Sequence, residues 1–168
     1  DLLLLANMDA KHWSIQTTPT EIDTLVLDMY ECFIPLSKQK NLIFNVILPD
    51  DLVPTLMIDN ERIRQTLSIL LDNAFTYTPA GNKVSLVLNY TPHALTISVI
   101  DNGPGIAEEH KPYIFDRFYR VDTSRHDKNH YGLGLSIAYE MMQLHHGQLT
   151  LQDTPGGGCT FSLIFPLK

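Results

Sequence analysis

Two glycine-containing segments constrain the fold of this chain most strongly, because each lies where a regular element ends and the backbone has to bend. Residues 101–106 (DNGPGI) follow an alternating apolar run, and residues 132–137 (GLGLSI) open an amphipathic helix. Glycine permits positive φ and lets another group approach the bare backbone closely. The free N–H groups at the start of that helix would suit a phosphate group.

Length and charge set the outer limits on function. A chain of 168 residues accommodates one domain with a substantial core. The net charge of −7 argues against general nucleic-acid binding, which needs an excess of Lys and Arg, but a nucleotide needs only local donors and a cation. The apolar run Leu2–Ala6 is too short to cross a bilayer, and no signal-peptide pattern precedes it. Cys32 and Cys159 are expected to be reduced and packed.

Apolar residues at helical spacing predict three long helices. The first carries a stripe from Ile22 to Leu36, the second a stripe from Ile63 to Ala74, and the third spans Leu133 to Leu144. Asp59 is placed to cap the second helix, and the Thr-Pro-Ala-Gly sequence at 78–81 ends it. A short helix is expected at about 108–115.

Alternating apolar residues predict strands, and the strands suggest a fold class. They are expected near residues 42–48, 84–88, 95–99, 149–151 and 161–165, with an antiparallel hairpin joining the second and third. Strands interspersed with helices predict an α+β fold, with helices on one face of the sheet. Residues 1–10 read as the end of a helix, 11–19 as a polar linker and 20–168 as the main domain.

Two further segments complete a recognisable order. Residues 70–74 (LLDNA) precede the two glycine segments, and residues 115–120 (FDRFYR) lie between them. In that order the four segments resemble the ATP-binding domain of bacterial sensor histidine kinases, in the GHKL superfamily that includes gyrase, Hsp90 and MutL. The resemblance runs from residue 1 to about residue 167. It implies a two-layer α/β sandwich of the GHKL (Bergerat) type, with a mixed sheet and a flexible ATP lid, and makes residues 1–10 the end of a dimerisation helix.

The resemblance assigns roles at the adenine end of the site. Asp101 would accept the exocyclic amine of adenine, since an ionised carboxylate only accepts hydrogen bonds; the alternative is a turn aspartate that bonds nearby backbone. Gly103, Gly105 and Ile106 belong to the same segment. Tyr77 would lie near the adenine, or be simply a partly buried helix aromatic.

Other residues would hold the phosphates. Asn73 would coordinate the Mg²⁺ that bridges them, a role that an amide oxygen suits. At the start of the last helix, Gly132, Leu133, Gly134 and Leu135 would bring backbone to the phosphates. Arg120, beside Tyr119, is the best candidate for a side-chain phosphate contact, because a guanidinium group matches phosphate oxygens. Arg117, Arg125 and Lys128 are alternatively surface charges.

Three departures from the family pattern lie at the phosphate end. Ile69 stands where histidine kinases often have Asn and the hydrolysing ATPases have Glu, and a hydrocarbon cannot activate water, so gyrase-type hydrolysis is not expected. Thr76 stands where Lys or Arg is common, and residues 129–131 (NHY) replace the usual Gly-Gly-Thr. These departures leave an alternative open: a nucleotide-responsive module with little kinase activity, whose parent acts as a phosphatase or scaffold.

The histidines supply neither an acceptor nor a metal site. A phosphoacceptor His is usually followed by an acidic residue on a long helix, and only His126-Asp127 has that dipeptide, within the expected lid. The acceptor is therefore expected outside this chain. His126 and His130 have the spacing of zinc ligands but no supporting ligands, so a zinc site is not expected.

The function implied by the resemblance is that of the catalytic ATP-binding domain of a two-component sensor histidine kinase. Such a domain binds ATP and Mg²⁺ and donates the γ-phosphoryl group to a His on a dimerisation domain. The implied partners are that dimerisation domain and a cognate response regulator. The parent would be a homodimeric membrane sensor with this domain in the cytoplasm.

Overall fold

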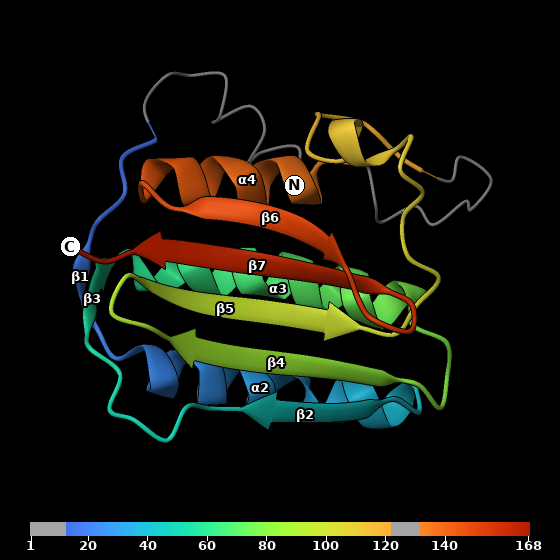
Figure 1. The fold of residues 1–168 in the computed structure, drawn as a ribbon, viewed down its shortest axis with the longest axis horizontal. Helices are drawn as coiled ribbons and strands as arrows, with labels where there is room; N and C mark the ends of the chain where they lie inside the picture. The colour runs from blue at the N-terminus through green and yellow to red at the C-terminus, as the bar shows by residue number, and fades with distance from the viewer. Residues whose placement is uncertain (1–12, 122–131) are drawn as a thin grey trace.

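The computed structural model describes residues 13–121 and 132–168. Its centre is a mixed five-stranded sheet in the order β2-β4-β5-β7-β6 (Figure 1). Strand β2 runs parallel to β4, and the remaining neighbours are antiparallel. The strands are β2 (Ile43–Ile47), β4 (Lys83–Tyr90), β5 (Ala94–Asp101), β6 (Gln148–Asp153) and β7 (Cys159–Pro166).

Three helices, α2 (Ile22–Gln39), α3 (Asn60–Tyr77) and α4 (Gly134–Leu144), cover one face of this sheet, as Figure 1 shows. The α+β class, the mixed sheet and the one-sided helical layer are thereby confirmed. The expected helix at 108–115 is reduced to the single turn η1 (Lys111–Tyr113). Pro112 accounts for this, because proline has no N–H to donate and is tolerated only in the first turn of a helix.

A small antiparallel ribbon of β1 (Thr18–Thr20) and β3 (Leu56–Ile58) was not predicted. Three residues are too few for alternation to stand out from chance, so pattern analysis had no signal here. The ribbon ties the segment before α2 to the segment that leads into α3. The boundaries proposed for the linker and the main domain stay a prediction.

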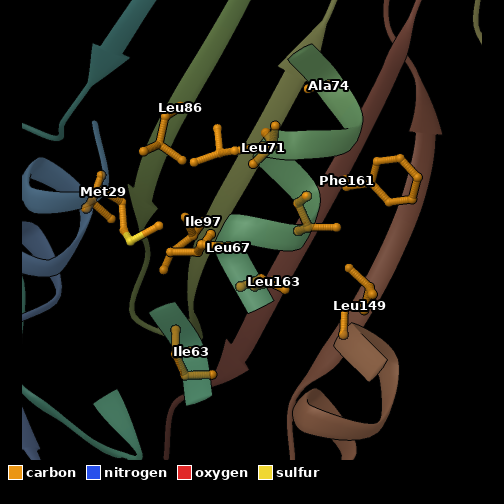
Figure 2. Packing of buried hydrophobic residues seen from close by; sticks show 14 of the residues in the cluster. Met29, Ile63, Leu67, Leu71, Ala74, Leu86, Ile97, Leu149, Phe161 and Leu163 are labelled. Carbon is orange, nitrogen blue, oxygen red and sulfur yellow. The ribbon is translucent and has the colours of Figure 1, made fainter. Parts of the chain in front are cut away.

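The core lies between the sheet and α3, which is the central helix. Leu67, Leu70 and Leu71 are fully buried, and Figure 2 shows side chains of α3 directed at Leu86 and Ile97 of the sheet. The periodicity predicted the stripe because one face of α3 meets strands along its whole length. A second, separate cluster contains Leu133, Ile137 and Met141 of the α4 region, with Trp13, Ile69 and Leu144 packed against it.

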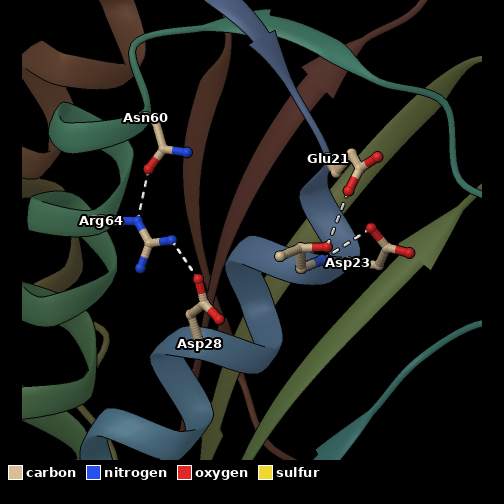
Figure 3. Close-up of polar contacts among 6 residues, drawn as sticks. Glu21, Asp23, Asp28, Asn60 and Arg64 are labelled. Carbon is tan, nitrogen blue, oxygen red and sulfur yellow. Dashed lines mark hydrogen bonds and ion pairs between the residues drawn. The ribbon is translucent and has the colours of Figure 1, made fainter.

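At the surface, α2 and α3 are joined by an ion pair. Arg64 donates from Nη2 to Asp28 at 2.6 Å, and its Nε donates to Asn60 at 2.6 Å (Figure 3). Both ionic side chains are substantially exposed, so this contact orients the helices more than it stabilises them. Within the described ranges, no helix has the length and apolarity that crossing a membrane requires.

Candidate functional site

Asp101 is the last residue of β5 and the one acidic residue on the helix-facing side of that strand. It continues the inward alternation of Leu95, Ile97 and Val99, and only 6% of it is exposed. Its Oδ1 accepts hydrogen bonds from the backbone N–H groups of Gly103 at 2.8 Å and Cys159 at 3.1 Å. Oδ2 accepts none from the described residues. The carboxylate is therefore held by one oxygen and presents the other as an acceptor.

Burial raises the pKa of Asp101 above its ordinary value, and the two backbone hydrogen bonds offset part of that rise. A buried carboxylate with an open acceptor atom is costly to the fold. Such a cost is typical of a residue retained for ligand recognition. This geometry supports the adenine role over that of a simple turn aspartate, although the bond to Gly103 is also the bond that a turn aspartate makes.

The turn between β6 and β7 packs against the backbone of Asp101. This contact was not predicted from the sequence. Gly158 has φ of +108°, and a Cβ there would lie 2.0 Å from the Asp101 carbonyl oxygen. Burial, together with the nearby Asp101 carboxylate, raises the pKa of the Cys159 thiol to about 12, so the thiol stays protonated. Residues 156–158 read as a plain glycine turn, and sequence carried no signal that this turn touches the site.

Gly103 brings the end of α3 to Asp101. A Cβ at Gly103 would lie 3.0 Å from Asp101 Oδ1 and 3.2 Å from the carbonyl oxygen of Tyr77. Glycine is needed for this close approach. Thr78, the next residue after Tyr77, is 6% exposed, and its hydroxyl is a buried oxygen without a hydrogen-bond partner in the described part of the chain. A buried hydroxyl of this kind is commonly satisfied by an ordered water.

The same face of α3 reaches the other glycine segment. A Cβ at Gly134 would lie 3.1 Å from Cγ2 of Ile69, so the start of α4 packs against α3 two turns before Tyr77. With a rise of about 1.5 Å per residue, Ile69 and Tyr77 are separated by about 12 Å along the helix. Asn73 lies halfway between them on the shared face and is half-buried. One helix face thus joins the Asp101 end to the α4 end.

The start of α4 has the features of an anion site. Leu133 is the N-cap residue and makes no side-chain cap bond. The first N–H groups of a helix have no intrahelical partners, so those of Gly134 and Leu135 are free of α4's own ladder. Gly132 has φ of +75°, and a Cβ there would lie 2.9 Å from Tyr119's carbonyl oxygen. A side chain at Gly132 would therefore disrupt this junction.

Residues 115–120 lie beside Gly132. The N–H of Phe118 donates to the Gly132 carbonyl at 2.9 Å. The hydroxyl of Tyr119 is 2.6 Å from Nδ1 of His110, a bond that joins this segment to the residue before η1. Arg120 is half-buried, and its Cγ lies 3.1 Å from the position of a Cβ at Gly132. A nucleotide contact by Tyr119 or Arg120 stays a prediction.

Ile69 and Thr76, which depart from the family pattern, make different contacts. Ile69 packs in the apolar cluster beneath the start of α4, and the Thr76 hydroxyl donates to the Asp72 carbonyl at 2.7 Å. Gly105 and Ile106 continue the segment after Gly103, with φ of +75° at Gly105. The residues expected in or near the lid, namely Arg125, His126, Lys128, His130 and residues 129–131, lie outside the described residues, as does the helix end at 1–10.

A divalent cation would have one protein ligand on this face. No group of three His, Cys, Asp or Glu side chains within residues 13–121 and 132–168 is arranged to hold a metal. Asn73 lies on α3 between Ile69 and Tyr77, and its amide would offer a hard oxygen ligand. That donor set suits Mg²⁺, which keeps several waters and is bound by one or two side chains together with substrate phosphates.

Comparison with known proteins identifies the family of this chain. Residues 58–168 match the model of the histidine kinase-, DNA gyrase B- and HSP90-like ATPases. The chain is 36% identical over 170 residues to the sensor histidine kinase TmoS of Ectopseudomonas mendocina, covering 99% of this chain and 17% of that protein. It is 32% identical over 168 residues to the adaptive-response sensory kinase SasA of Microcystis aeruginosa, covering 99% and 43%. The chain thus spans less than half the length of either relative.

Solved structures share the fold. Full-length ShkA in complex with AMPPNP superposes with a TM-score of 0.84 at 26% identity, over 97% of this chain and 34% of that one. The histidine kinase ThkA in complex with the response regulator TrrA gives a TM-score of 0.81 at 23% identity, over 99% and 46%. The chain belongs to the histidine kinase-, DNA gyrase B- and HSP90-like ATPase family and is homologous to the ATP-binding catalytic domain of sensor histidine kinases.

Proposed function

We propose that this chain binds MgATP along the face of α3 and donates the γ-phosphoryl group to a histidine outside the chain. One observation supports the proposal most directly. A single face of α3 runs from the buried carboxylate of Asp101, which has one oxygen free to accept a hydrogen bond, to the start of α4, where no side chain in the described part of the chain caps the helix. Gly103, whose N–H donates to Asp101, meets α3 at Tyr77, and Gly134 meets α3 at Ile69. A nucleotide has the matching polarity, with a hydrogen-bonding base at one end and phosphates at the other.

Each residue has a defined task in this proposal. Oδ2 of Asp101 accepts the adenine amine, and the N–H groups at the start of α4 donate to phosphate oxygens. Asn73 holds the cation, which neutralises charge on the phosphates when it is bound. The bond from the γ-phosphorus to the bridging oxygen breaks, a bond to the acceptor imidazole nitrogen forms, and ADP leaves. Catalysis is then mostly positioning and charge stabilisation.

Two solved relatives support the choice of partners. The ShkA structure holds AMPPNP, and the ThkA structure holds a response regulator. We propose corresponding partners for the parent of this chain: a dimerisation domain that ends at residues 1–10 and carries the acceptor, and a cognate response regulator. A homodimeric parent, its attachment to a membrane and the cytoplasmic position of this domain stay predictions.

The test is phosphotransfer in trans. The chain is incubated with labelled MgATP alone and with a separate acceptor fragment of the same parent. Alone it should acquire no phosphohistidine, because none of its histidines lies in an acceptor context; the fragment should become labelled. Asp101→Asn is the matched control, which should label neither. Label on the chain itself, or a fragment that stays unlabelled while AMPPNP binds, contradicts the kinase proposal.

The alternative, a module with little kinase activity, rests on Ile69 and Thr76. Relatives that match over nearly the whole chain are themselves sensor kinases, which disfavours it. Failure of transfer with intact, Mg²⁺-independent nucleotide binding would favour it.

A further inference from the structure

Trp13 docks on an apolar cluster that runs along α4 and includes Leu133 at its start. Its ring packs against the group formed by Leu133, Ile137 and Met141, which is separate from the main core. The guanidinium carbon of Arg62, on α3, lies 4.6 Å from the centre of the Trp13 ring, within the range of a cation–π contact. Trp13 is the only tryptophan of the chain, and it precedes the domain proper by several residues.

The backbone that follows Trp13 is fixed to the same place. The N–H of Gln16 donates to Oδ2 of Asp59 at 2.9 Å, while Oδ1 of Asp59 caps α3 by accepting from Arg62 N–H at 3.2 Å. The N–H of Asp59 in turn donates to Nε2 of His145, just after α4, at 3.0 Å. Strand β1 then continues the attachment by pairing with β3. The segment 13–20 is therefore bound at several points to the ends of α3 and α4.

We infer that Trp13 is a positioning residue that couples the segment preceding the domain to the phosphate end of the nucleotide site. The inference rests on the proposed function, because it assigns the phosphates to the start of α4. Any displacement of the segment 13–20 would remove Trp13 from its cluster. The position of the segment would then change the affinity for the triphosphate.

The physical route runs along α4. Trp13 lies on Arg62 in the first turn of α3, about 10 Å along that helix from Ile69, where α4 begins. Leu133 belongs to the cluster beneath Trp13, is 2% exposed, and is also the N-cap residue of α4. Ile69 packs on the same cluster and contacts the Cβ position of Gly134. A closely packed group transmits displacement because it leaves no void to absorb it. Loss of the Trp13 ring should let Leu133 and the first turn of α4 shift, which disorders the N–H donors but leaves Asp101 in place.

Coupling of this kind is reciprocal. If the packing of Trp13 changes the affinity for nucleotide, binding of nucleotide must change the packing of Trp13. The lone tryptophan makes this measurable in the unmodified chain. Fluorescence of Trp13 is followed during titration with AMPPNP in Mg²⁺, ADP and adenosine, with excitation where adenine does not absorb. We expect a blue shift that is largest with AMPPNP, smaller with ADP and absent with adenosine. Calorimetry records binding of each ligand independently of the signal.

Variants test the reverse direction. Trp13→Ala should weaken AMPPNP binding by at least about fivefold, the low end of typical coupling, and leave adenosine binding unchanged. Trp13→Phe should restore most of the loss because it keeps an aromatic ring in the cluster. Met57→Ala is the control, since Met57 lies on the same ribbon with 61% of its surface exposed and should change neither affinity.

The outcomes separate this inference from the proposed function. If calorimetry shows AMPPNP bound while Trp13 emission stays constant, or if Trp13→Ala binds AMPPNP like the wild type, the coupling is refuted and nucleotide binding stands. Equal losses for AMPPNP and adenosine would show a general structural effect and also refute it. If the wild type binds no AMPPNP, both fail. The fluorescence experiment needs no substitution, so it decides even if Trp13→Ala does not fold.

Discussion

At the scale of single residues, the buried charge of Asp101 lowers the stability of the fold, while the proposed function requires that charge. The protein keeps a buried carboxylate on the core side of β5, although burial penalises its charge. Asp101→Asn keeps an oxygen for the N–H groups of Gly103 and Cys159 but places an amide where the adenine amine needs an acceptor. We expect calorimetry to show adenine nucleotide affinity reduced by about 1–3 kcal/mol, the cost of an unmatched buried polar group. An unchanged affinity in a folded variant would contradict the adenine role.

The pH dependence of that residue has a definite sign. The folded-state pKa of Asp101 is raised, so folding favours the protonated form. Its contribution to stability is present below the unfolded pKa and is lost as pH rises through the folded value. At neutral pH Asp101→Asn should therefore unfold at no lower denaturant concentration than the wild type. Nucleotide affinity of the wild type should fall on acidification through the same range, and the variant should lack that component.

Thr76 offers a gain-of-affinity test. It is half-buried in the last turn of α3, and its hydroxyl bonds only its own helix backbone. Thr76→Lys would add a long cationic side chain one helical turn from Asn73, from where it can extend toward the phosphates, and would improve helix propensity. A charge-assisted contact of about 1.5–3 kcal/mol corresponds to at least about tenfold tighter AMPPNP binding. ADP should gain less, and Thr76→Gln, similar in reach but neutral, should gain nothing; equal gains for Lys and Gln would exclude the charge effect.

At the scale of elements, the β6–β7 hairpin contains a matched pair of glycines. Gly156 and Gly158 both have positive φ, but a Cβ at Gly156 meets nothing within 4 Å, whereas at Gly158 it would overlap the Asp101 carbonyl oxygen. Gly156→Ala should cost about 1–2 kcal/mol, the strain of left-handed backbone. Gly158→Ala should cost clearly more in denaturant unfolding, and should also weaken nucleotide binding. Equal costs would show that the turn does not support Asp101.

Helix α3 allows its core to be compared with its surface. Leu67→Ala, at a fully buried position, should lower the free energy of unfolding by about 2–5 kcal/mol. Arg64→Gln, which breaks the exposed pair with Asp28, should lower it by less than about 1 kcal/mol. Denaturant unfolding of both variants tests the assignment of α3 as the central packing element. A larger effect at Arg64 than at Leu67 would contradict it.

The long elements could be predicted because each buries one continuous face. The α3 stripe and the inward residues of β5 repeat at the period of their element, and such repetition survives without knowledge of the partner. Strands β1 and β3 were not predicted because three residues are too few to show an alternating pattern. The helix predicted at 108–115 was too long because Pro112 prevents η1 from continuing. Asp59 was correctly predicted to cap α3, but its bonds to Gln16 and His145 join distant segments and left no local signal.

At the scale of the whole molecule, the proposed site is assembled from four parts of the chain. The glycine segments and Asn73 could be proposed from the sequence because their residue types and order resemble those of one family. The support of Asp101 by Gly158, the orphan hydroxyl of Thr78 and the docking of Trp13 were not. These depend on which elements become neighbours in three dimensions, and spacing along the chain does not encode that.

The central claim, that the two ends of the α3 face bind one magnesium nucleotide, is tested most directly by calorimetric titration of AMPPNP with and without Mg²⁺. The account predicts saturable binding that tightens markedly with Mg²⁺, because Asn73 and the helix start act only on the phosphate end. Adenosine, which lacks that end, should bind weakly and without regard to the metal. AMPPNP binding that is indifferent to Mg²⁺ and no tighter than that of adenosine would contradict the account.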